Sequence, residues 1–290
     1  MTLSSLDNPL PDKAFDSGLY IVATPIGNLA DLSQRAVQLL TAADIVAVED
    51  SRVTGKLLHH IGLKKKMRRY NDYSSADDRD RLLAAAQTGV VVLVSDAGTP
   101  LISDPGYKLV RAAREQGIYV STAPGPSAAI AALSISGLPT DKFLFAGFLP
   151  AKEKARAAAI NGYRNIDATL IFYESGPRLG SALAALALVL GGRGAVVARE
   201  LTKKFEEVVT GTLPDLAARY ANETPKGEIV VIISPPEAAG TAEEGDADAA
   251  LAEALTRLPA AKAAAEIAHR FALDRKQVYA RANAMKSKCS

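Results

Sequence analysis

The chain has 290 residues, 48% of them hydrophobic and 23% charged, with a formal net charge of +2. Since single hydrophobic cores stop growing at roughly 250 residues, this length predicts more than one domain. Because Cys289 is the only cysteine, an intramolecular disulfide and a cysteine-based metal site are excluded. The net charge is close to zero, so an anionic partner would have to bind at a local basic patch.

Residues 1–17 predict a flexible N-terminal tail. They lack the basic start and the apolar run of a signal peptide, and no stretch of the chain reaches the roughly 20 apolar residues that cross a bilayer. We therefore expect a cytoplasmic protein without a membrane partner, and the single cysteine fits a reducing compartment.

Short β-branched runs alternate with amphipathic stretches over residues 18–150. The runs LYIVA, IVAVE and VVVLVS are interleaved with segments such as SQRAVQLLTAA and GYKLVRAAREQG. This alternation predicts βα units around a buried sheet, and thus a first α/β domain. Each run ends in a polar or turn-forming cluster, and open α/β sheets bind ligands at such strand ends.

The first of these clusters is TPIGN, from Thr24 to Asn28. It follows a strand and precedes a helix, as a dinucleotide fingerprint does, but Gly27 is its only glycine and Pro25 has no backbone N–H to donate. A tight turn is the simpler interpretation. Glu49, at the end of the second strand, suits an acid that binds ribose hydroxyls, which leaves a nicotinamide enzyme or an ordinary class I methyltransferase open.

The helix start after the second strand carries acid, hydroxyl and base side chains, in Asp50, Ser51, Arg52 and Lys56. Asp50 or Ser51 as the N-cap of this helix is one interpretation, and substrate handling by these side chains is the other. The basic run KKKMRR, residues 64–69, follows the helix. It is either a solvated loop or part of a nucleic-acid footprint.

The segment SDAGTPLISDPG, residues 95–106, has the strongest chemical character in the sequence. It holds two acids, Asp96 and Asp104, together with two glycines and two prolines directly after an apolar strand. Proline fixes φ and glycine lets a ligand approach the backbone closely, so the loop presents carbonyls and carboxylates rigidly. Those groups suit a cationic ligand that donates hydrogen bonds, such as a sulfonium amino acid, and a braced surface loop is the alternative.

The strand pattern restarts after residue 150. The runs TLIFYE, GAVVARE and GEIVVII predict a second α/β domain over residues 151–234. One strand ends in Tyr173 and Glu174, and the next is followed by a charged run that begins at Arg199. This run is either a solvated face or, like the other strand ends, a part of the site.

Residues 235–248, PPEAAGTAEEGDAD, predict a linker, and residues 249–290 are helical in pattern. A break near Leu273 and Asp274 divides two helices, with Asp274 as the cap of the second, and the unit resembles a helix-turn-helix. From Lys262 onward there are seven bases and two acids. This excess predicts contact with phosphates, and a packing or dimer-contact element is the alternative.

Motifs of metal sites and of two large enzyme classes are missing from the sequence. There is no HExxH, and the three histidines, His59, His60 and His269, do not form a ligand pattern. No GxSxG and no GxxxxGK[ST] occurs, which excludes an α/β-hydrolase triad and a P-loop. We expect no metal.

Taken together, TPIGN, EDSRVTGKLL, SDAGTPLISDPG, PGPSA, FYES and GEIVVII resemble the ordered motifs of the tetrapyrrole-methylase superfamily over residues 18–233. Within it, EDSRVT and SDAGTPLISDPG resemble the ribosomal RNA small-subunit methyltransferase I family. Porphyrin and precorrin methylases typically carry GxGPGD in the first loop and GDPxxxGRG in the second, and this chain has neither. A tetrapyrrole methylase stays open as an alternative, as does a non-catalytic RNA-binding protein.

The resemblance implies two α/β domains of the class III methyltransferase type, with S-adenosylmethionine in the cleft between them, and a homodimer. It also implies 2'-O-methylation of a cytidine in 16S ribosomal RNA, with the free RNA or the 30S subunit as partner. By motif position, the implied cofactor contacts are Pro25, Ile26, Gly98, Thr99, Pro100, Leu101, Ile102, Ser103, Ser127, Ala128, Tyr173, Glu174, Leu201, Thr202, Glu228 and Ile229.

A ribose hydroxyl is a weak nucleophile, so a carboxylate in the cleft is expected to accept its proton. The candidates for this general base are Asp50, Asp96, Asp104 and Glu174. Phosphates that flank the target need basic side chains near the cleft. The candidates for these contacts are Arg52, Lys56, Arg199, Lys203 and Lys204.

Overall fold

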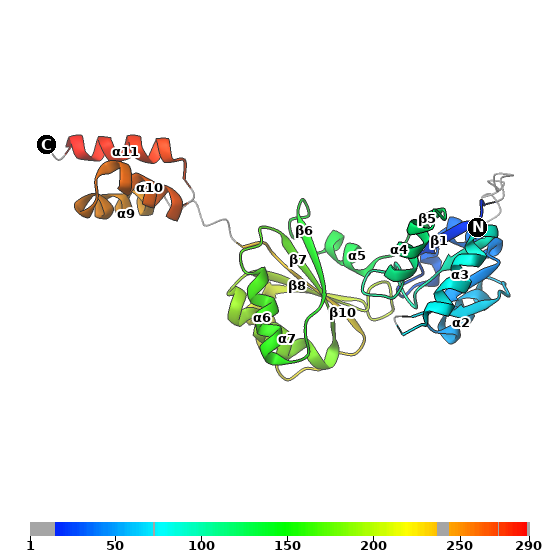
Figure 1. Cartoon of the computed structure of the whole chain (residues 1–290). Coiled ribbons are helices and arrows are strands. Elements are labelled where there is room, and N and C mark those ends of the chain that lie inside the picture. The colour runs from blue at the N-terminus through cyan, green and yellow to red at the C-terminus, as the bar shows by residue number, and fades with distance from the viewer. Residues whose placement is uncertain (1–14, 72, 237–243, 272, 289–290) are drawn as a thin grey trace, which may run out of the picture.

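The computed structural model describes residues 15–71, 73–236, 244–271 and 273–288. The predicted tail lies outside these residues except for its last three positions, and so does half of the predicted linker, residues 237–243. Two five-stranded sheets and a unit of three helices follow one another along the chain (Figure 1).

The first sheet is entirely parallel, with the strand order β3-β2-β4-β1-β5. Its strands are β1 (Gly18–Val22), β2 (Ile45–Val48), β3 (Met67–Arg69), β4 (Val90–Leu93) and β5 (Val120–Ala123). The three central strands are buried along their whole length. Helices cover both faces of such a sheet, which is why its three central strands are continuous apolar runs in the sequence.

Four helices cover the two faces of the first sheet. The helices α1 (Gln34–Ala42) and α2 (Ser51–His60) pack with Tyr20 and Val22 of β1 on one face. The helices α3 (Ala76–Thr88) and α4 (Tyr107–Glu115) pack with Leu19 and Ile21 on the other. A short 3-10 helix, η1 (Leu29–Asp31), follows the first loop. The sequence-predicted βα units are confirmed.

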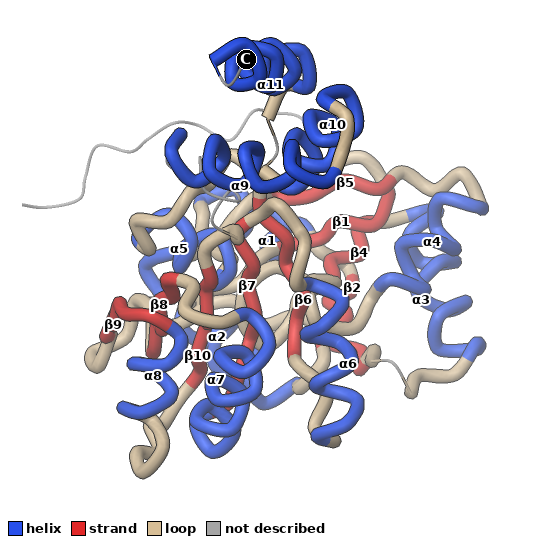
Figure 2. Tube along the Cα trace, turned by 90° about the vertical axis from the view of Figure 1, so that its left-hand side faces the viewer, coloured by secondary structure: helices blue, strands red, loops and turns tan. Residues whose placement is uncertain are grey.

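The second sheet is mixed, with the strand order β6-β7-β10-β8-β9 (Figure 2). Its strands are β6 (Phe143–Phe148), β7 (Thr169–Ser175), β8 (Gly194–Arg199), β9 (Glu207–Thr212) and β10 (Glu228–Ile233). Only β6 and β7 run parallel to each other, and the other neighbours are antiparallel. The helix α5 (Ala128–Ile135) covers one face. The helices α6 (Glu153–Tyr163), α7 (Gly176–Leu190) and α8 (Leu213–Arg219) cover the other.

The chain enters the second sheet earlier than the predicted boundary at residue 150. Strand β6 pairs with β7, and α5 packs against β7 and β10, so residues 128–148 belong to the second sheet by contact. The sequence shows an apolar strand in FLFAGF but contains no local signal for its partner, because pairing depends on residues far along the chain.

The C-terminal unit consists of α9 (Glu244–Arg257), α10 (Ala260–Arg270) and α11 (Arg275–Lys288) around a small core of their own. The Asp274 carboxylate accepts hydrogen bonds from the backbone N–H groups of Lys276 and Gln277, as expected of the cap of α11. Helix α9 begins at Glu244, inside the predicted linker. Among the helices that the structure describes, none is long and apolar enough to cross a membrane.

Candidate active site

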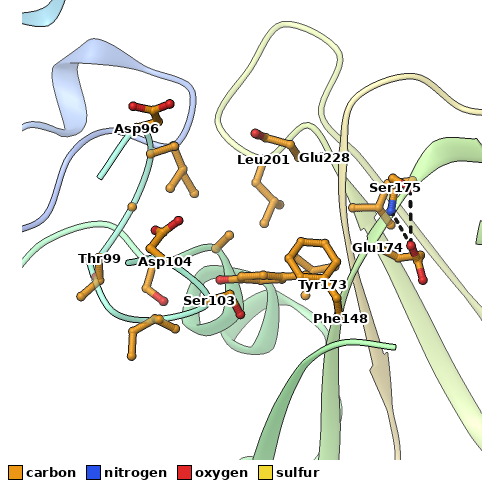
Figure 3. Close-up of a pocket in the computed structure, with 18 of the residues that line it drawn as sticks. Asp96, Thr99, Ser103, Asp104, Phe148, Tyr173, Glu174, Ser175, Leu201 and Glu228 are labelled. Carbon is orange, nitrogen blue, oxygen red and sulfur yellow. Dashed lines mark hydrogen bonds between the residues drawn. The ribbon is translucent and has the colours of Figure 1, made fainter. Parts of the chain in front are cut away.

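A pocket of about 430 Å³ opens between the two sheets, where the loops after β1, β2, β4 and β5 meet the strand ends of the second sheet (Figure 3). Its lining residues are Ile26, Glu49, Asp96, Ala97, Gly98, Thr99, Ile102, Ser103, Asp104, Ser127, Ala128, Phe148, Tyr173, Glu174, Ser175, Leu201, Gly227, Glu228, Ile229 and Val230. Its volume lies in the range of roughly 300–1,000 Å³ that is typical of small-ligand sites.

The backbone of the loop 95–106 is fixed by contacts with other loops. The N–H and C=O of Gly98 bond to those of Thr24, at N···O distances of 3.0 and 2.9 Å, and so join this loop to the first loop. The Thr99 hydroxyl donates to the carbonyl of Pro126 at 2.9 Å. Gly98 has a φ of +81°, which a β-branched side chain would strain.

Backbone strain is concentrated in two loops beside the pocket. Within the described chain, the non-glycine residues with a positive φ are Leu101, Ser103, Glu200 and Thr202. A residue in this conformation costs roughly 1–3 kcal/mol, and such residues cluster at functional sites. Here they follow β4 and β8, and Ser103 lines the pocket itself.

One wall of the pocket is aromatic. Tyr173 packs edge-on against Phe145 and Phe148, with ring centroids 4.8 and 5.7 Å away. Its hydroxyl accepts a hydrogen bond from the backbone N–H of Ala129 at 3.2 Å, and burial raises its pKa, so the phenol stays neutral. Phe148 is 55% exposed, a large exposed fraction for an aromatic side chain at the rim of a cavity.

Two of the predicted base candidates face the pocket from the first domain. Burial and the nearby charge of Glu49 raise the pKa of Asp104 to about 6. Figure 3 shows Asp104 across from Tyr173, on the loop that also carries Thr99 and Ser103. Burial also raises the pKa of Asp96, whose carboxylate accepts a hydrogen bond from the Asp50 N–H at 3.1 Å.

Glu174 is the most deeply buried acid of the pocket, with 3% of its surface exposed. Its Oε1 accepts from the Ser175 N–H at 2.9 Å and lies 3.3 Å from the Arg178 guanidinium. Its Oε2 is buried and has no hydrogen-bond partner among the described residues. A buried oxygen of this kind is costly unless a further donor reaches it.

Asp50, the remaining base candidate, does not line the pocket. It is the N-cap of α2, accepts the Arg52 N–H at 2.8 Å and pairs with the Arg52 guanidinium. These hydrogen bonds lower its pKa to about 2. The N-cap interpretation of this residue is therefore confirmed.

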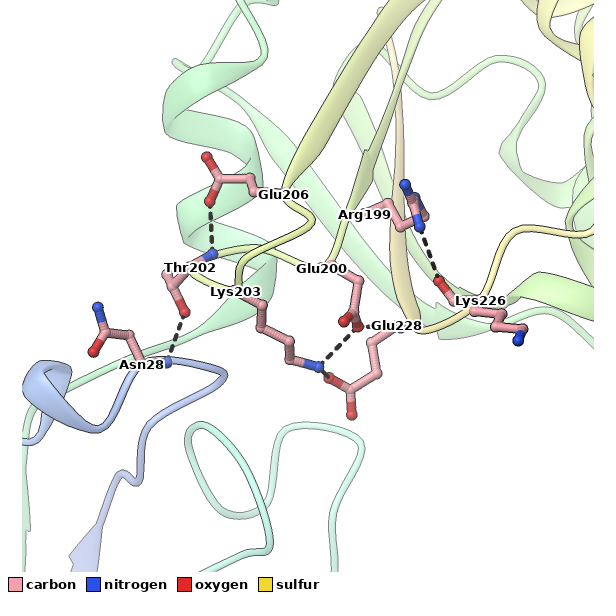
Figure 4. Close-up of polar contacts among 8 residues, drawn as sticks. All are labelled: Asn28, Arg199, Glu200, Thr202, Lys203, Glu206, Lys226 and Glu228. Carbon is pink, nitrogen blue, oxygen red and sulfur yellow. Dashed lines mark hydrogen bonds and ion pairs between the residues drawn. The ribbon is translucent and has the colours of Figure 1, made fainter.

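The five basic residues predicted to hold phosphates all lie outside the pocket lining. Lys203 bridges Glu200 and Glu228, with both N···O distances at 2.9 Å (Figure 4). Arg199 pairs with Glu207 at 3.0 Å. Lys204 lies 5.7 Å from the ring of Phe205, while Arg52 and Lys56 are exposed on α2.

The structure brings most of the implied cofactor contacts to the pocket. Those that line it are Ile26, Gly98, Thr99, Ile102, Ser103, Ser127, Ala128, Tyr173, Glu174, Leu201, Glu228 and Ile229. Those that do not are Pro25, Pro100, Leu101 and Thr202. The sequence interpretation missed Ala97, Phe148, Ser175, Gly227 and Val230, and considered Glu49 only as a ribose-binding acid.

The first and second domains also meet directly beside the pocket. The backbone N–H of Asn28 donates to the Thr202 hydroxyl at 3.1 Å (Figure 4). Gly27 lies so close to the loop after β8 that a Cβ there would be 2.5 Å from Lys203 Cγ and 2.7 Å from the Leu201 carbonyl oxygen. No group of three or more potential metal ligands occurs in the part of the chain that the structure describes.

Two family models match the chain: Tetrapyrrole (Corrin/Porphyrin) Methylases over residues 18–217, and the RsmI C-terminal HTH domain over residues 241–286. Among solved structures, diphthine synthase superposes with a TM-score of 0.59 at 18% identity, over 74% of this chain and 89% of that one. Uroporphyrin-III-C-methyltransferase from Thermus thermophilus gives 0.54 at 22% identity, over 75% and 94%. At these identities the likeness concerns the fold.

Curated relatives are much more similar in sequence. The ribosomal RNA small subunit methyltransferase I of Erythrobacter litoralis is 52% identical, over 93% of this chain and 96% of its own length. The protein of the same name from Mesorhizobium japonicum is 49% identical, over 94% and 93%. Because both family models and these relatives agree along the chain, the protein belongs to the ribosomal RNA small subunit methyltransferase I family of the tetrapyrrole methylases.

Proposed function

We propose that this protein transfers the methyl group of S-adenosylmethionine to the ribose 2'-hydroxyl of a cytidine in 16S ribosomal RNA. The observation that carries the proposal is the charge of the pocket. Its lining contains the carboxylates Glu49, Asp96, Asp104, Glu174 and Glu228, and none of its described lining residues is Lys or Arg. Such a pocket favours a cationic ligand and disfavours an anionic one.

The pocket residues fit S-adenosylmethionine, which when bound supplies an electrophilic methyl group on a sulfonium. The buried Glu174 Oε2 calls for a hydrogen-bond donor. The aromatic wall of Phe148 and Tyr173 offers a surface for a purine. The rigid backbone of the loop 95–106 presents amide and carbonyl groups with little ordering cost on binding. The lining residues implied by the resemblance would hold the cofactor.

Asp104 is the proposed general base. Its pKa of about 6 leaves it ionised at neutral pH and still basic enough to take up a hydroxyl proton as the bond to the methyl group forms. Asp50 and Glu174 are less suited, because the first caps α2 and the second pairs with Arg178. Asp96 stays the second candidate.

The RNA backbone is proposed to stay outside the acidic pocket, with only the target ribose entering. The exposed cations Lys56 and Lys204 are available to hold the flanking phosphates. Arg52, Arg199 and Lys203 would first have to exchange their present carboxylate partners for a phosphate.

The test is transfer of labelled methyl groups to unmethylated 16S ribosomal RNA and to 30S subunits prepared from it. Incorporation into either one, and its loss when the target ribose is 2'-deoxy, is the expected result. Label that persists on the deoxy substrate would rule out the ribose hydroxyl as acceptor. Transfer to a tetrapyrrole instead, or no transfer at all, would favour one of the alternative functions.

Gly27→Ala is expected to weaken S-adenosylmethionine binding by about tenfold or more, because the added methyl group forces the loop after β8 away from the first loop. Calorimetric titration measures the change. Gly162→Ala is the control, since Gly162 lies in α6, outside the pocket lining, and nothing lies within 4 Å of the added Cβ there. Equal cofactor affinity in wild type and Gly27→Ala would show that the two loops need not touch.

A homodimer and a cytoplasmic location stay predictions of the family resemblance. Helix α5 leaves Ile130 and Ile135 about half exposed, which supports the proposal that this helix packs against a second copy. Sedimentation of the full chain at several concentrations tests the dimer.

A further inference from the structure

A second concave surface lies at the carboxyl end of β3, outside the pocket already described. This β3 groove has a volume of about 550 Å³ and is formed mainly by Arg68, Arg69, Asn71, Tyr73, Ser74 and Asp78. Its lining is mostly polar, in contrast to the aromatic and apolar wall of the pocket. A groove of this kind suits a charged, hydrogen-bonding ligand.

The β3 groove and the pocket share one edge of the first sheet. Arg69 lies directly beside Val48 in the parallel pairing of β3 with β2, and Glu49, which follows Val48, lines the pocket. Adjacent strands are roughly 4.8 Å apart. A ligand that extends from the pocket along this edge would therefore reach the β3 groove next.

The charge of the β3 groove is positive. The side chains of Arg68 and Arg69 make no hydrogen bond and no ion pair with any other residue that the structure describes. Among the described residues that line the groove, Asp78 is the only acid, and its carboxylate accepts from the Ser75 hydroxyl at 2.7 Å and from the Ser75 N–H at 3.2 Å. Those hydrogen bonds hold Asp78 in the cap of α3 and, together with the nearby charges of Arg81 and Arg68, lower its pKa. Because no ion pair joins Asp78 to Arg68 or Arg69, the two guanidinium groups remain available to an anion.

Tyr73 projects from the β3 groove into solvent, with 96% of its surface exposed. Its backbone is held by a compact turn: the Asn71 side chain accepts from the Tyr73 N–H at 3.1 Å, and the Asn71 N–H donates to the Ser74 hydroxyl at 2.8 Å. Tyr70, three residues before Tyr73, is 5% exposed and packs in the hydrophobic core of the first sheet. An aromatic ring held in water beside two arginines is the arrangement that stacks on nucleic-acid bases.

We propose that the β3 groove binds a nucleotide next to the methylated one on the same RNA strand. Arg68 holds its phosphate, because a guanidinium matches phosphate oxygens in a bidentate geometry, and Arg69, the next residue of β3, adds positive charge at the same edge of the sheet. Tyr73 stacks on its base, which gives affinity with little dependence on base identity. This inference rests on the proposed function, since it takes the strand to pass through the acidic pocket.

The experiment uses the full chain, unmethylated 16S ribosomal RNA transcribed in vitro and 30S subunits reconstituted from it. We expect Tyr73→Leu to raise KM for the RNA substrate by about tenfold and Tyr73→Phe to change it little, since phenylalanine keeps the stacking face. Arg68→Gln and Arg69→Gln should each raise KM and lower the slope of log affinity against log salt by about one. The S-adenosylmethionine affinity of all four variants should stay at the wild-type value.

Arg114→Gln is the matched control, because Arg114 is exposed in the last turn of α4, at the opposite edge of the first sheet. It removes one positive charge and should leave KM unchanged. If wild type methylates the RNA but the Tyr73 and arginine variants match Arg114→Gln, the β3 groove does not bind RNA while the proposed function stands. If wild type neither binds nor methylates the RNA, the proposed function fails and this inference falls with it.

Discussion

The Asp104→Asn variant is expected to transfer methyl groups about 10²–10⁴-fold more slowly than wild type in single turnovers, the usual contribution of general-base catalysis. The asparagine side chain fills the same space between the loop 95–106 and Tyr173 but cannot take up the hydroxyl proton. Cofactor affinity should fall far less than the rate. Rapid quench with labelled S-adenosylmethionine and calorimetric titration measure the two quantities.

The pH dependence provides a second readout of the same residue. Since burial and Glu49 raise the pKa of Asp104 to about 6, the wild-type rate should rise tenfold per pH unit below pH 6 and level off above it. In Asp104→Asn this dependence should disappear. A wild-type rate that is flat from pH 5 to 8 contradicts the assignment.

The raised pKa also predicts a stability difference. A carboxyl group whose pKa is higher in the folded protein than its usual value of 3.8 stabilises the fold below pH 4, and this contribution is lost as the pH rises through about 6. Asparagine does not ionise. Asp104→Asn should therefore melt at a higher temperature than wild type at pH 8, and at nearly the same temperature at pH 4.

Three matched substitutions separate Asp104 from the other acids. Asp50→Asn should mainly weaken the start of α2, because Asp50 pairs with Arg52. Glu174→Gln should mainly disturb the pocket wall, because Glu174 pairs with Arg178. Neither variant should change the pH dependence of the transfer rate much. Asp96→Asn tests the second candidate. Near-normal single-turnover rates in all four amide variants would mean that positioning alone supports the transfer.

A chain that ends after Pro235 is expected to bind 16S ribosomal RNA about 100-fold more weakly at low salt, because seven bases against two acids lie beyond residue 261. Each lost phosphate contact reduces the salt slope by about 0.7–0.9, so the difference from the full chain should shrink as salt rises. S-adenosylmethionine affinity should hardly change, since none of the described residues beyond 230 lines the pocket. Anisotropy titrations at several salt concentrations measure the effect.

A full-length chain with Arg275→Gln and Lys276→Gln is the companion variant. Both residues are exposed at the start of α11, so it removes charge and leaves the three-helix unit in place. This variant should show part of the loss in RNA affinity, and part of the change in salt slope, that the truncated chain shows. If the truncated and full-length chains bind RNA equally and with the same slope, the unit has a structural role or a role in dimer contact.

The fold follows largely from local sequence patterns. The buried runs of the first sheet, the N-cap at Asp50 and the cap at Asp274 depend on residues close together in sequence, and the structure confirms them. The membership of β6 and α5 in the second sheet could not be predicted in this way. Their place in the second sheet depends on pairing with β7 and on packing against β10, and the local segments FLFAGF and PSAAIAAL contain no pattern that indicates either partner.

The candidate site was predictable where one loop supplies several residues, as in the segment 95–106. Tyr173, Glu174 and Glu228, on distant strands, were predicted only through the family motifs, and Phe148, which belongs to none of those motifs, was not predicted. Charge runs were the least informative, because Lys203 and Arg199 find acidic partners that only the folded chain brings near. Whether a basic side chain is free to bind a phosphate therefore depends on its ion pairs in the folded chain, which the sequence alone does not show.

The order of strands in the two sheets has a consequence for biosynthesis. The first sheet uses residues 18–123 alone, so it can form while the rest of the chain is still being made. The second sheet cannot, because its last strand in sequence, β10, lies between β7 and β8 and joins its two halves. Since residues 227–230 also complete the pocket, a nascent chain gains its binding site only after β10 has left the ribosomal tunnel.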